Sequence, residues 1–188
     1  MLIMTSKSYP AQHPFIMKIF KASVIVLLLI IGQSAFAQEK SYKETVTENP
    51  TADEDIKVVS DYLTAVMGNQ ITDAGNLLAD DYVSRGPAYQ ETETKEEHLA
   101  SWTEANEGRT KQKNDFVSNT FRVIDGDQKG DWVSIWGLYT FTQNEVEINL
   151  SYQYTAMIED GKISSSIVYY DNLAVYKEMG YELIAKKK

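Results

Sequence analysis

The hydrophobic period of this chain changes near residue 110, and this change restricts the possible folds more than any other feature. From residue 51 to residue 108 apolar side chains recur every three or four positions, as they do on one face of an α-helix. From residue 113 to residue 170 they alternate with polar ones, as in half-buried β-strands. Helices followed by strands that short turns connect predict an α+β domain, in which the helices pack on an antiparallel sheet.

The first half of the domain predicts three helices, over residues 51–67, 71–82 and 92–108. Gly68 breaks the first helix, and Gly108 ends the third. A threonine caps the third helix, either Thr92 or Thr94, because a side-chain hydroxyl can accept a hydrogen bond from a free backbone N–H of the first turn.

The second half predicts four strands, over residues 113–124, 130–143, 145–159 and 162–170. Asp160–Gly161 forms a tight hairpin turn between the last two. Gly137 interrupts an aromatic stretch of the second strand, where it either bends the strand or makes room for an aromatic neighbour. Long strands with a bulky face indicate a sheet that curves over the helices and leaves a hollow at one end.

Residues 17–37 have the three parts of a secretory signal peptide. Lys18 and Lys21 form the positively charged segment, and the apolar run that follows is too short to span a membrane. Ala35 and Ala37 are the small residues that a bacterial signal peptidase reads. We therefore expect the following organisation: a true start at Met17 rather than Met1, cleavage after Ala37, a linker over residues 38–50, and a single domain over residues 51–188.

The charge and the cysteine content exclude several classes of protein. The whole chain has a formal net charge of −9, and the expected mature chain is more acidic, because Lys7, Lys18 and Lys21 leave with residues 1–37. Such a domain has no electrostatic footprint for nucleic acid and little attraction to an anionic membrane. The chain has no cysteine, so it cannot carry a lipoprotein anchor. We expect a free periplasmic or secreted bacterial protein without a stable membrane anchor.

Two stretches resemble a known family: "VVSDYLTAVMGNQITDAGNLLADDYVSRGP" and the closing "GKISSSIVYYDNLAVYKEMG". With the helix and strands between them, they are similar to the nuclear transport factor 2-like superfamily, in its SnoaL-like branch, over roughly residues 53–181. The resemblance implies a cone-shaped curved antiparallel sheet packed on three N-terminal helices, also described as a cystatin-like roll. It further implies a pocket in the cone and a homodimer formed through the outer face of the sheet.

The resemblance carries a few site residues. Tyr62 falls where ketosteroid isomerases have a tyrosine that stabilises an enolate, but Gly86 stands where those enzymes have their general base. SnoaL-type cyclases use a buried aspartate helped by a histidine, which matches Asp171 and His98. A raised pKa would suit Asp171 to general acid or base work at a pocket mouth. We favour a helix cap for Asp171 and an exposed position for His98, beside Glu96 and Glu97.

The expected pocket is lined by large aromatic side chains and by one rim arginine that could contact an anion: Tyr62, Trp102, Trp136, Tyr154, Tyr169 and Arg85. For most of the strand aromatics we favour a place in the core or in a dimer interface. One mature histidine and no cysteine cannot build a zinc site, and the chain has no phosphate loop or dinucleotide fingerprint. We therefore expect no cofactor and no metal.

Three functions follow from this pattern. The first is binding of a small, largely apolar molecule in the cone pocket. The second is a proton-transfer enzyme, cyclase-, isomerase- or dehydratase-like, that uses Asp171 with His98 or Tyr62. The third is a dimerising interaction module. We favour binding, because the sequence shows no complete catalytic set.

Overall fold

The structure, a computed structural model, describes residues 41–182 and 184. The expected signal peptide and start site lie outside these residues. Helices and strands follow each other in this order: α2 (Tyr42–Thr45), β1 (Val46–Thr47), α3 (Ala52–Met67), α4 (Ile71–Asn76), β2 (Leu78–Arg85), β3 (Thr92–Thr94), α5 (Lys95–Gly108), β4 (Arg109–Val123), β5 (Gly130–Gln143), β6 (Val146–Glu159), β7 (Lys162–Tyr170) and α6 (Asn172–Glu178).

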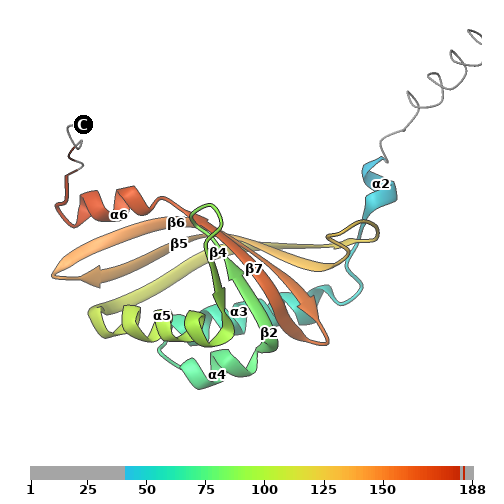
Figure 1. The fold of residues 1–188 in the computed structure, drawn as a ribbon, viewed down its shortest axis with the longest axis horizontal. Helices are drawn as coiled ribbons and strands as arrows, with labels where there is room; N and C mark the ends of the chain where they lie inside the picture. The colour runs from blue at the N-terminus through green and yellow to red at the C-terminus, as the bar shows by residue number, and fades with distance from the viewer. Residues whose placement is uncertain (1–40, 183, 185–188) are drawn as a thin grey trace, which may run out of the picture. The chain divides into compact units, whose positions relative to one another are not determined.

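The strands form one seven-stranded sheet in the order β1-β4-β5-β6-β7-β2-β3. It is strongly curved and does not close, and α3 and α5 lie on its concave side (Figure 1). This confirms the predicted α+β class and the curved sheet. The sheet is mixed rather than purely antiparallel, because β2 runs parallel to β7.

The two long helices form where the sequence predicts them. Three acidic residues favour the first turn of α3, and Val59, Leu63 and Val66 bury its apolar face. Thr94 caps α5 in a reciprocal capping box with Glu97, so Thr94 rather than Thr92 is the cap. Both helices pack against the inner, concave face of the sheet and leave its other face to the outside (Figure 1).

The second helix is shorter than predicted. α4 ends at Asn76, and the stretch from Leu78 to Arg85 forms strand β2 instead of continuing the helix. Leu78 pairs with Ile163, and Val83 with Ser165, both on β7. This long-range pairing outweighs the local helical pattern, as tertiary contacts often do.

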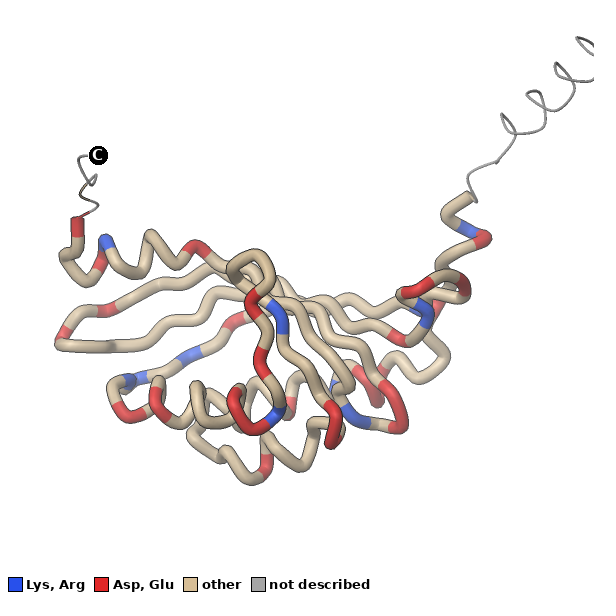
Figure 2. The backbone as a smooth tube through the Cα atoms, in the orientation of Figure 1, with Lys and Arg blue, Asp and Glu red and all other residues tan. Residues whose placement is uncertain are grey.

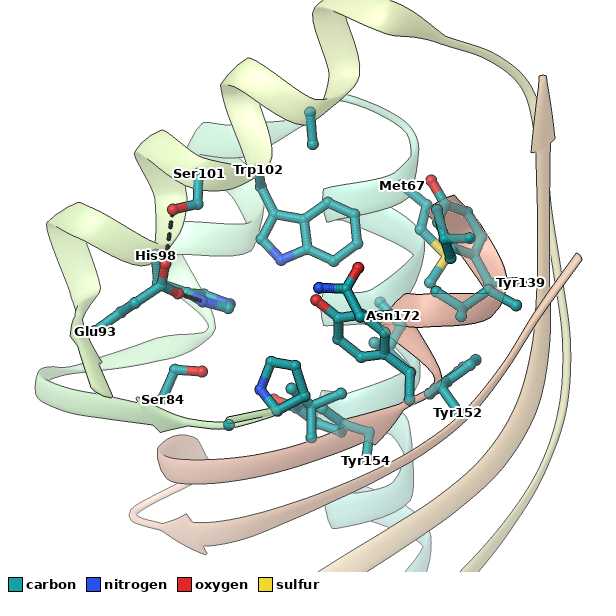
Figure 3. A pocket seen from close by; sticks show the side chains of 18 of the residues that line it. Met67, Ser84, Glu93, His98, Ser101, Trp102, Tyr139, Tyr152, Tyr154 and Asn172 are labelled. Atoms are coloured by element: carbon teal, nitrogen blue, oxygen red, sulfur yellow. Dashed lines mark hydrogen bonds and ion pairs between the residues drawn. The ribbon is translucent and has the colours of Figure 1, made fainter. Parts of the chain in front are cut away.

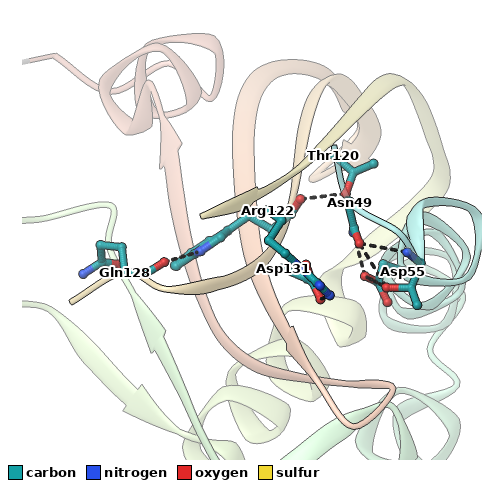
Figure 4. Close-up of polar contacts among 8 residues, drawn as sticks. Asn49, Asp55, Thr120, Arg122, Gln128 and Asp131 are labelled. Atoms are coloured by element: carbon teal, nitrogen blue, oxygen red, sulfur yellow. Dashed lines mark hydrogen bonds and ion pairs between the residues drawn. The ribbon is translucent and has the colours of Figure 1, made fainter. Parts of the chain in front are cut away.

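The segment predicted as a linker contains ordered structure. Within residues 38–50, α2 is followed by β1, which pairs with β4. The side-chain amide of the buried Asn49 donates to Asp55 (2.7 Å) and to Thr120 (2.8 Å) (Figure 4). Its oxygen, Oδ1, accepts from the backbone N–H and the hydroxyl of Thr51. Beside it, Arg122 and Asp131 form a two-fold ion pair between β4 and β5 (Figure 4). The folded part of the chain therefore begins before residue 51.

Charged side chains concentrate on the helices and turns, and the central strands are mostly uncharged (Figure 2). No helix within the described part of the chain is long and apolar enough to cross a membrane.

Candidate functional site

A cavity of about 270 Å³ lies between α3, α5 and the inner face of the sheet (Figure 3). Its walls come from α3, the end of β2 and the turn after it, β3, α5, the start of β4, the strands β5 to β7, and α6. Most of the large side chains on these walls are aromatic: Tyr62, Trp102, Tyr139, Phe141, Tyr152, Tyr154 and Tyr170. Such a hollow has the concave, mainly apolar character of small-molecule sites.

A chain of hydrogen bonds joins three elements at one end of this cavity. His98 on α5 places Nε2 2.6 Å from the Tyr62 hydroxyl on α3. Its Nδ1 lies 2.8 Å from a carboxylate oxygen of Glu93 on β3. The other oxygen of Glu93 accepts from the Ser101 hydroxyl at 2.7 Å (Figure 3). A carboxylate, an imidazole and a phenol therefore form one connected group at the cavity wall.

Burial sets the protonation of this group. Burial lowers the pKa of His98, and the neighbouring Glu93 only partly opposes that change. A carboxylate can only accept, so the proton of the neutral ring lies on Nδ1, and Nε2 accepts from Tyr62. Burial raises the pKa of Tyr62 well above its ordinary value, so Tyr62 stays a phenol. The resting group is a neutral imidazole between a carboxylate and a phenol.

A second group of hydroxyls lies on the strands at the same end. Tyr82 on β2 and Ser166 on β7 share a hydrogen bond of 2.7 Å. Tyr154 stacks on Tyr62 with ring centroids 6.0 Å apart, and its buried hydroxyl has no well-aligned hydrogen-bond partner in the described part of the chain. Burial raises the pKa of both Tyr82 and Tyr154, which keeps these groups uncharged.

The other end of the cavity is aromatic and carries one cation. Tyr139 packs against Phe141 with centroids 4.8 Å apart, and Trp102 lies 6.4 Å from Tyr139. The guanidinium carbon of Arg109 lies 4.5 Å from the centroid of Phe141. Val175 and Met179, from and just after α6, pack against this aromatic cluster.

The structure brings three of the six expected pocket residues into the cavity wall. Tyr62, Trp102 and Tyr154 line the cavity together with His98. The expected exposed position of His98 is wrong, because this residue is only 8% exposed. It packs under the sheet, where the Tyr82 ring lies 5.4 Å from the imidazole.

Asp171 is a helix cap rather than a partner of His98. Its side chain accepts from the backbone N–H of Ala174 at 3.0 Å, at the start of α6. It is exposed and does not line the cavity, although Asn172 does. The structure therefore does not place Asp171 in the cavity wall with His98, and the favoured capping interpretation agrees with the observed hydrogen bond.

Trp136, Tyr169 and Arg85 were expected in the pocket wall, and the structure places all three outside it. Trp136 and Tyr169 are 46% and 59% exposed on the outer face of the sheet. In β7 the cause is a bulge: Ile158 pairs with Ile163, but Met157 pairs with Ser165, which leaves one extra residue. Beyond this point the inward residues are Ser166, Val168 and Tyr170 instead of their neighbours.

Two residues of the site, Glu93 and Arg109, were not singled out from the sequence. Glu93 directly precedes the cap Thr94, and His98 is the fourth residue of the helix. An apolar pair at these two positions often packs together at a helix start. The same spacing brings Glu93 to His98, so their positions around the cap could have predicted this contact from the sequence. Within the described residues no group of acidic or histidine side chains could hold a metal ion.

The comparisons with known proteins bear on the fold. No family model and no curated protein matches the chain. Among solved structures, a Shewanella putrefaciens protein described as a SnoaL-like polyketide cyclase aligns with a TM-score of 0.56 and 8% identity, over 68% of this chain and 96% of that one. IdmH from Streptomyces antibioticus, described as a polyketide cyclase, aligns with a TM-score of 0.54 and 15% identity, over 68% and 99%.

A Catenulispora acidiphila protein with a ketosteroid isomerase-like fold, solved with trimethylamine, aligns with a TM-score of 0.53 and 17% identity, over 67% and 94%. The chain therefore has a nuclear transport factor 2-like fold, as predicted. SnoaL-like proteins are among its structural neighbours. At these identities the likeness defines the fold, and the activity has to be argued from the site.

Proposed function

We propose that this domain binds a small, largely apolar molecule in the cavity, with a polar atom of that molecule at Tyr62. The observation that carries the proposal is the connected Glu93–His98–Tyr62 group at the wall of an otherwise aromatic hollow. The cavity volume of about 270 Å³ lies just below the range of about 300–1,000 Å³ for drug-sized ligands. A molecule of one or two rings suits this space.

The same group favours a second candidate function, which is proton transfer. His98 is neutral and therefore ready to accept a proton, and the Glu93 carboxylate stabilises the imidazolium that results. Tyr62 relays the proton: its oxygen accepts one proton from the bound molecule while its own passes to Nε2 of His98. The electron pair stays on the bound molecule, and return of the proton to another of its atoms completes an isomerisation. The phenol is regenerated in the same step, in accord with its raised pKa.

The proton-transfer role passes from Asp171 to His98 in this proposal. Some structural neighbours are described as polyketide cyclases, and another, from Bacillus subtilis, as an isomerase. These descriptions support the reaction class only weakly, because one fold hosts many activities. The weight of the proposal rests on the three side chains and their hydrogen bonds.

The experiment uses 2-tetralone, an apolar two-ring ketone with acidic protons beside its carbonyl group. Binding is measured by titration calorimetry, and exchange of those protons with solvent deuterium is followed by NMR. We expect the protein to bind 2-tetralone and to accelerate the exchange. His98→Gln should slow the accelerated exchange by about 10²–10⁴-fold, and Asp171→Asn should leave it unchanged.

The outcomes separate the two candidate functions. Binding without accelerated exchange supports the binding function and refutes proton transfer for this class of ketone. Accelerated exchange that His98→Gln leaves intact shows that another group moves the proton. Absence of 2-tetralone binding, together with no small molecule in native mass spectra of the purified protein, argues against a binding cavity altogether.

We also propose that the protein is exported. The support is the pattern of residues 17–37, with its basic, apolar and small-residue segments in order. Amino-terminal sequencing of the protein recovered from the periplasm or medium should begin at Gln38. A mature chain that retains residues 17–37 would refute this proposal.

A further inference from the structure

Arg109 is the cation of the cavity wall, at the end away from His98. It is the first residue of β4 and directly follows α5. Its guanidinium carbon lies over two aromatic rings, 4.5 Å from the centroid of Phe141 and 5.8 Å from that of Tyr139. In Figure 3, Glu93 and His98 lie on one side of the cavity, and Tyr139 and Met67 on the other. The rings that hold Arg109 therefore belong to the end opposite the Glu93–His98 pair.

The guanidinium of Arg109 has no counter-charge within the described part of the chain. The ion pairs of these residues involve other cations, and no carboxylate pairs with Arg109. Its Nε atom is buried and has no hydrogen-bond partner among the described residues. Stacking on an aromatic ring satisfies the face of a guanidinium, and the Tyr139 hydroxyl lies within hydrogen-bonding reach of it, but its in-plane N–H groups meet no carboxylate acceptor within the part of the chain that the structure describes. A buried donor without an acceptor is costly.

The acidic side chains of the wall are already engaged, and Glu93 lies at the end away from the rings that hold Arg109 (Figure 3). Glu93 bonds His98 and Ser101, and Glu91 accepts from the backbone N–H of Ala88. The cavity is thus polarised, with the Glu93 carboxylate at one end and a guanidinium without a carboxylate partner among the described residues at the other. An anionic group on a bound molecule would be repelled from the first end and attracted to the second.

We infer that the molecule bound in this cavity is an organic anion, a carboxylate by chemical class, whose charged group is held by Arg109. Its apolar body lies between Trp102 and Tyr152, and its opposite end reaches Tyr62. A planar guanidinium suits a carboxylate because it offers two parallel N–H donors. This inference rests on the proposed binding function and adds the charge and the orientation of the ligand.

The test compares 2-naphthoate with its neutral analogue 2-naphthamide on the full chain by titration calorimetry. We expect the wild type to bind naphthoate about 10- to 100-fold more tightly than naphthamide, the range for a hydrogen-bonded charge. Arg109→Met should lose this preference and keep the naphthamide affinity. Arg109→Lys should retain part of it, because the charge remains without the planar donors. Arg85→Met is the matched control, an exposed arginine outside the cavity, and should bind like the wild type.

Naphthamide affinity reports whether the cavity is intact in each variant, and Arg109→Gln replaces the methionine variant if that one fails to fold. Equal wild-type affinity for the two probes overturns the inference about Arg109 and leaves the binding function standing. A preference for naphthoate that survives both Arg109→Met and Arg109→Gln also overturns it. Failure of the wild type to bind either probe counts against the binding function itself, and the inference falls with it.

Discussion

The two faces of the central sheet carry similar aromatic side chains in very different surroundings. On the inner face, Tyr139 and Tyr154 are 3% and 5% exposed, and they form the cavity wall. On the outer face, Trp136 and Tyr169 are 46% and 59% exposed. The difference comes from α3, α5 and α6, which pack on the inner face only. The residue types are similar on both faces, so strand register decides whether an aromatic side chain lines the cavity or is exposed.

The cross-strand pairing shows how sharply register separates the faces. Trp136 pairs with Val117 on β4 and with Gln153 on β6, and Gln153 pairs with Tyr169 on β7. These four residues form one row across the outer face. The next row, one residue along, contains Gly137 and the cavity-lining Tyr152 and Tyr170, and its β4 member, Phe116, is 37% exposed. A shift of one residue exchanges an exposed row for a cavity wall.

The largest effect is expected on the inner face at Gly137, where the Tyr152 ring occupies the space of a side chain. A Cβ atom there would lie 2.4 Å from the Tyr152 ring, so the ring would have to move and lose its hydrogen bond to Asn114. Gly137 therefore makes room for an aromatic neighbour, one of its two predicted roles. Gly137→Val should lower the free energy of unfolding by about 3 kcal/mol, measured by urea denaturation.

The control for Gly137 is its neighbour on the outer face. Leu138→Ala should change the free energy of unfolding by less than about 1 kcal/mol, because Leu138 is 41% exposed. Equal costs for the two substitutions would mean that the two faces of β5 are packed alike.

Two stacked tyrosines of the inner side sharpen the comparison, because their hydroxyls differ. Tyr62→Phe leaves Nε2 of the buried His98 without its partner and should cost about 2 kcal/mol of unfolding free energy. Tyr154→Phe removes a buried hydroxyl that has no aligned partner, so it should be neutral or stabilising by up to about 1 kcal/mol. Paired denaturation curves check this, and a destabilised Tyr154→Phe variant would show that its hydroxyl is in fact bonded.

The sequence correctly predicts the features that depend on a local pattern of residues. It fails for features that depend on pairing between strands distant in the sequence. The spacing of apolar residues in α3, the threonine cap of α5 and the Asp160–Gly161 turn are local, and the structure confirms them. The faces of β7 depend on a bulge at Ser164, which only the pairing with β6 reveals. Simple alternation assigns Tyr169 to the pocket in place of Tyr170, and so reverses the two faces.

The residues of the candidate site also differ in whether the sequence could predict them. Tyr62, Trp102 and Tyr154 were named from aromatic patterning, and they line the cavity because α3, α5 and β6 keep regular geometry. Arg109 carries no signal in the sequence, because a basic residue between a helix and a strand is usually solvated. Only the approach of Phe141, from another strand, shows that its guanidinium lies over an aromatic ring.

The pH dependence of stability should also differ between the two faces of the sheet. Burial against the inner side lowers the pKa of His98 below 6.5, so near this pH the unfolded chain binds a proton that the folded chain does not. His98 therefore contributes stability that is full above pH 6.5 and is lost as the pH falls through its folded pKa. Denaturation between pH 7.5 and pH 5.5 should show a smaller loss of stability in His98→Gln than in the wild type. Tyr169→Ser on the outer face should follow the wild-type slope, and an unchanged slope in His98→Gln would contradict the buried neutral histidine.

The smallest effect on the folded chain is expected on the outer face, at Trp136. Trp136→Lys should change the free energy of unfolding by no more than about 0.5 kcal/mol at low protein concentration, because the indole is nearly half exposed. The homodimer predicted from the sequence would bury the row of Val117, Trp136 and Tyr169, and a lysine in that row would place a charge in an apolar interface. Sedimentation at several concentrations should then show a dimer for the wild type and a monomer for Trp136→Lys. A wild type that stays monomeric at every concentration would refute the dimer and leave the outer face simply solvated.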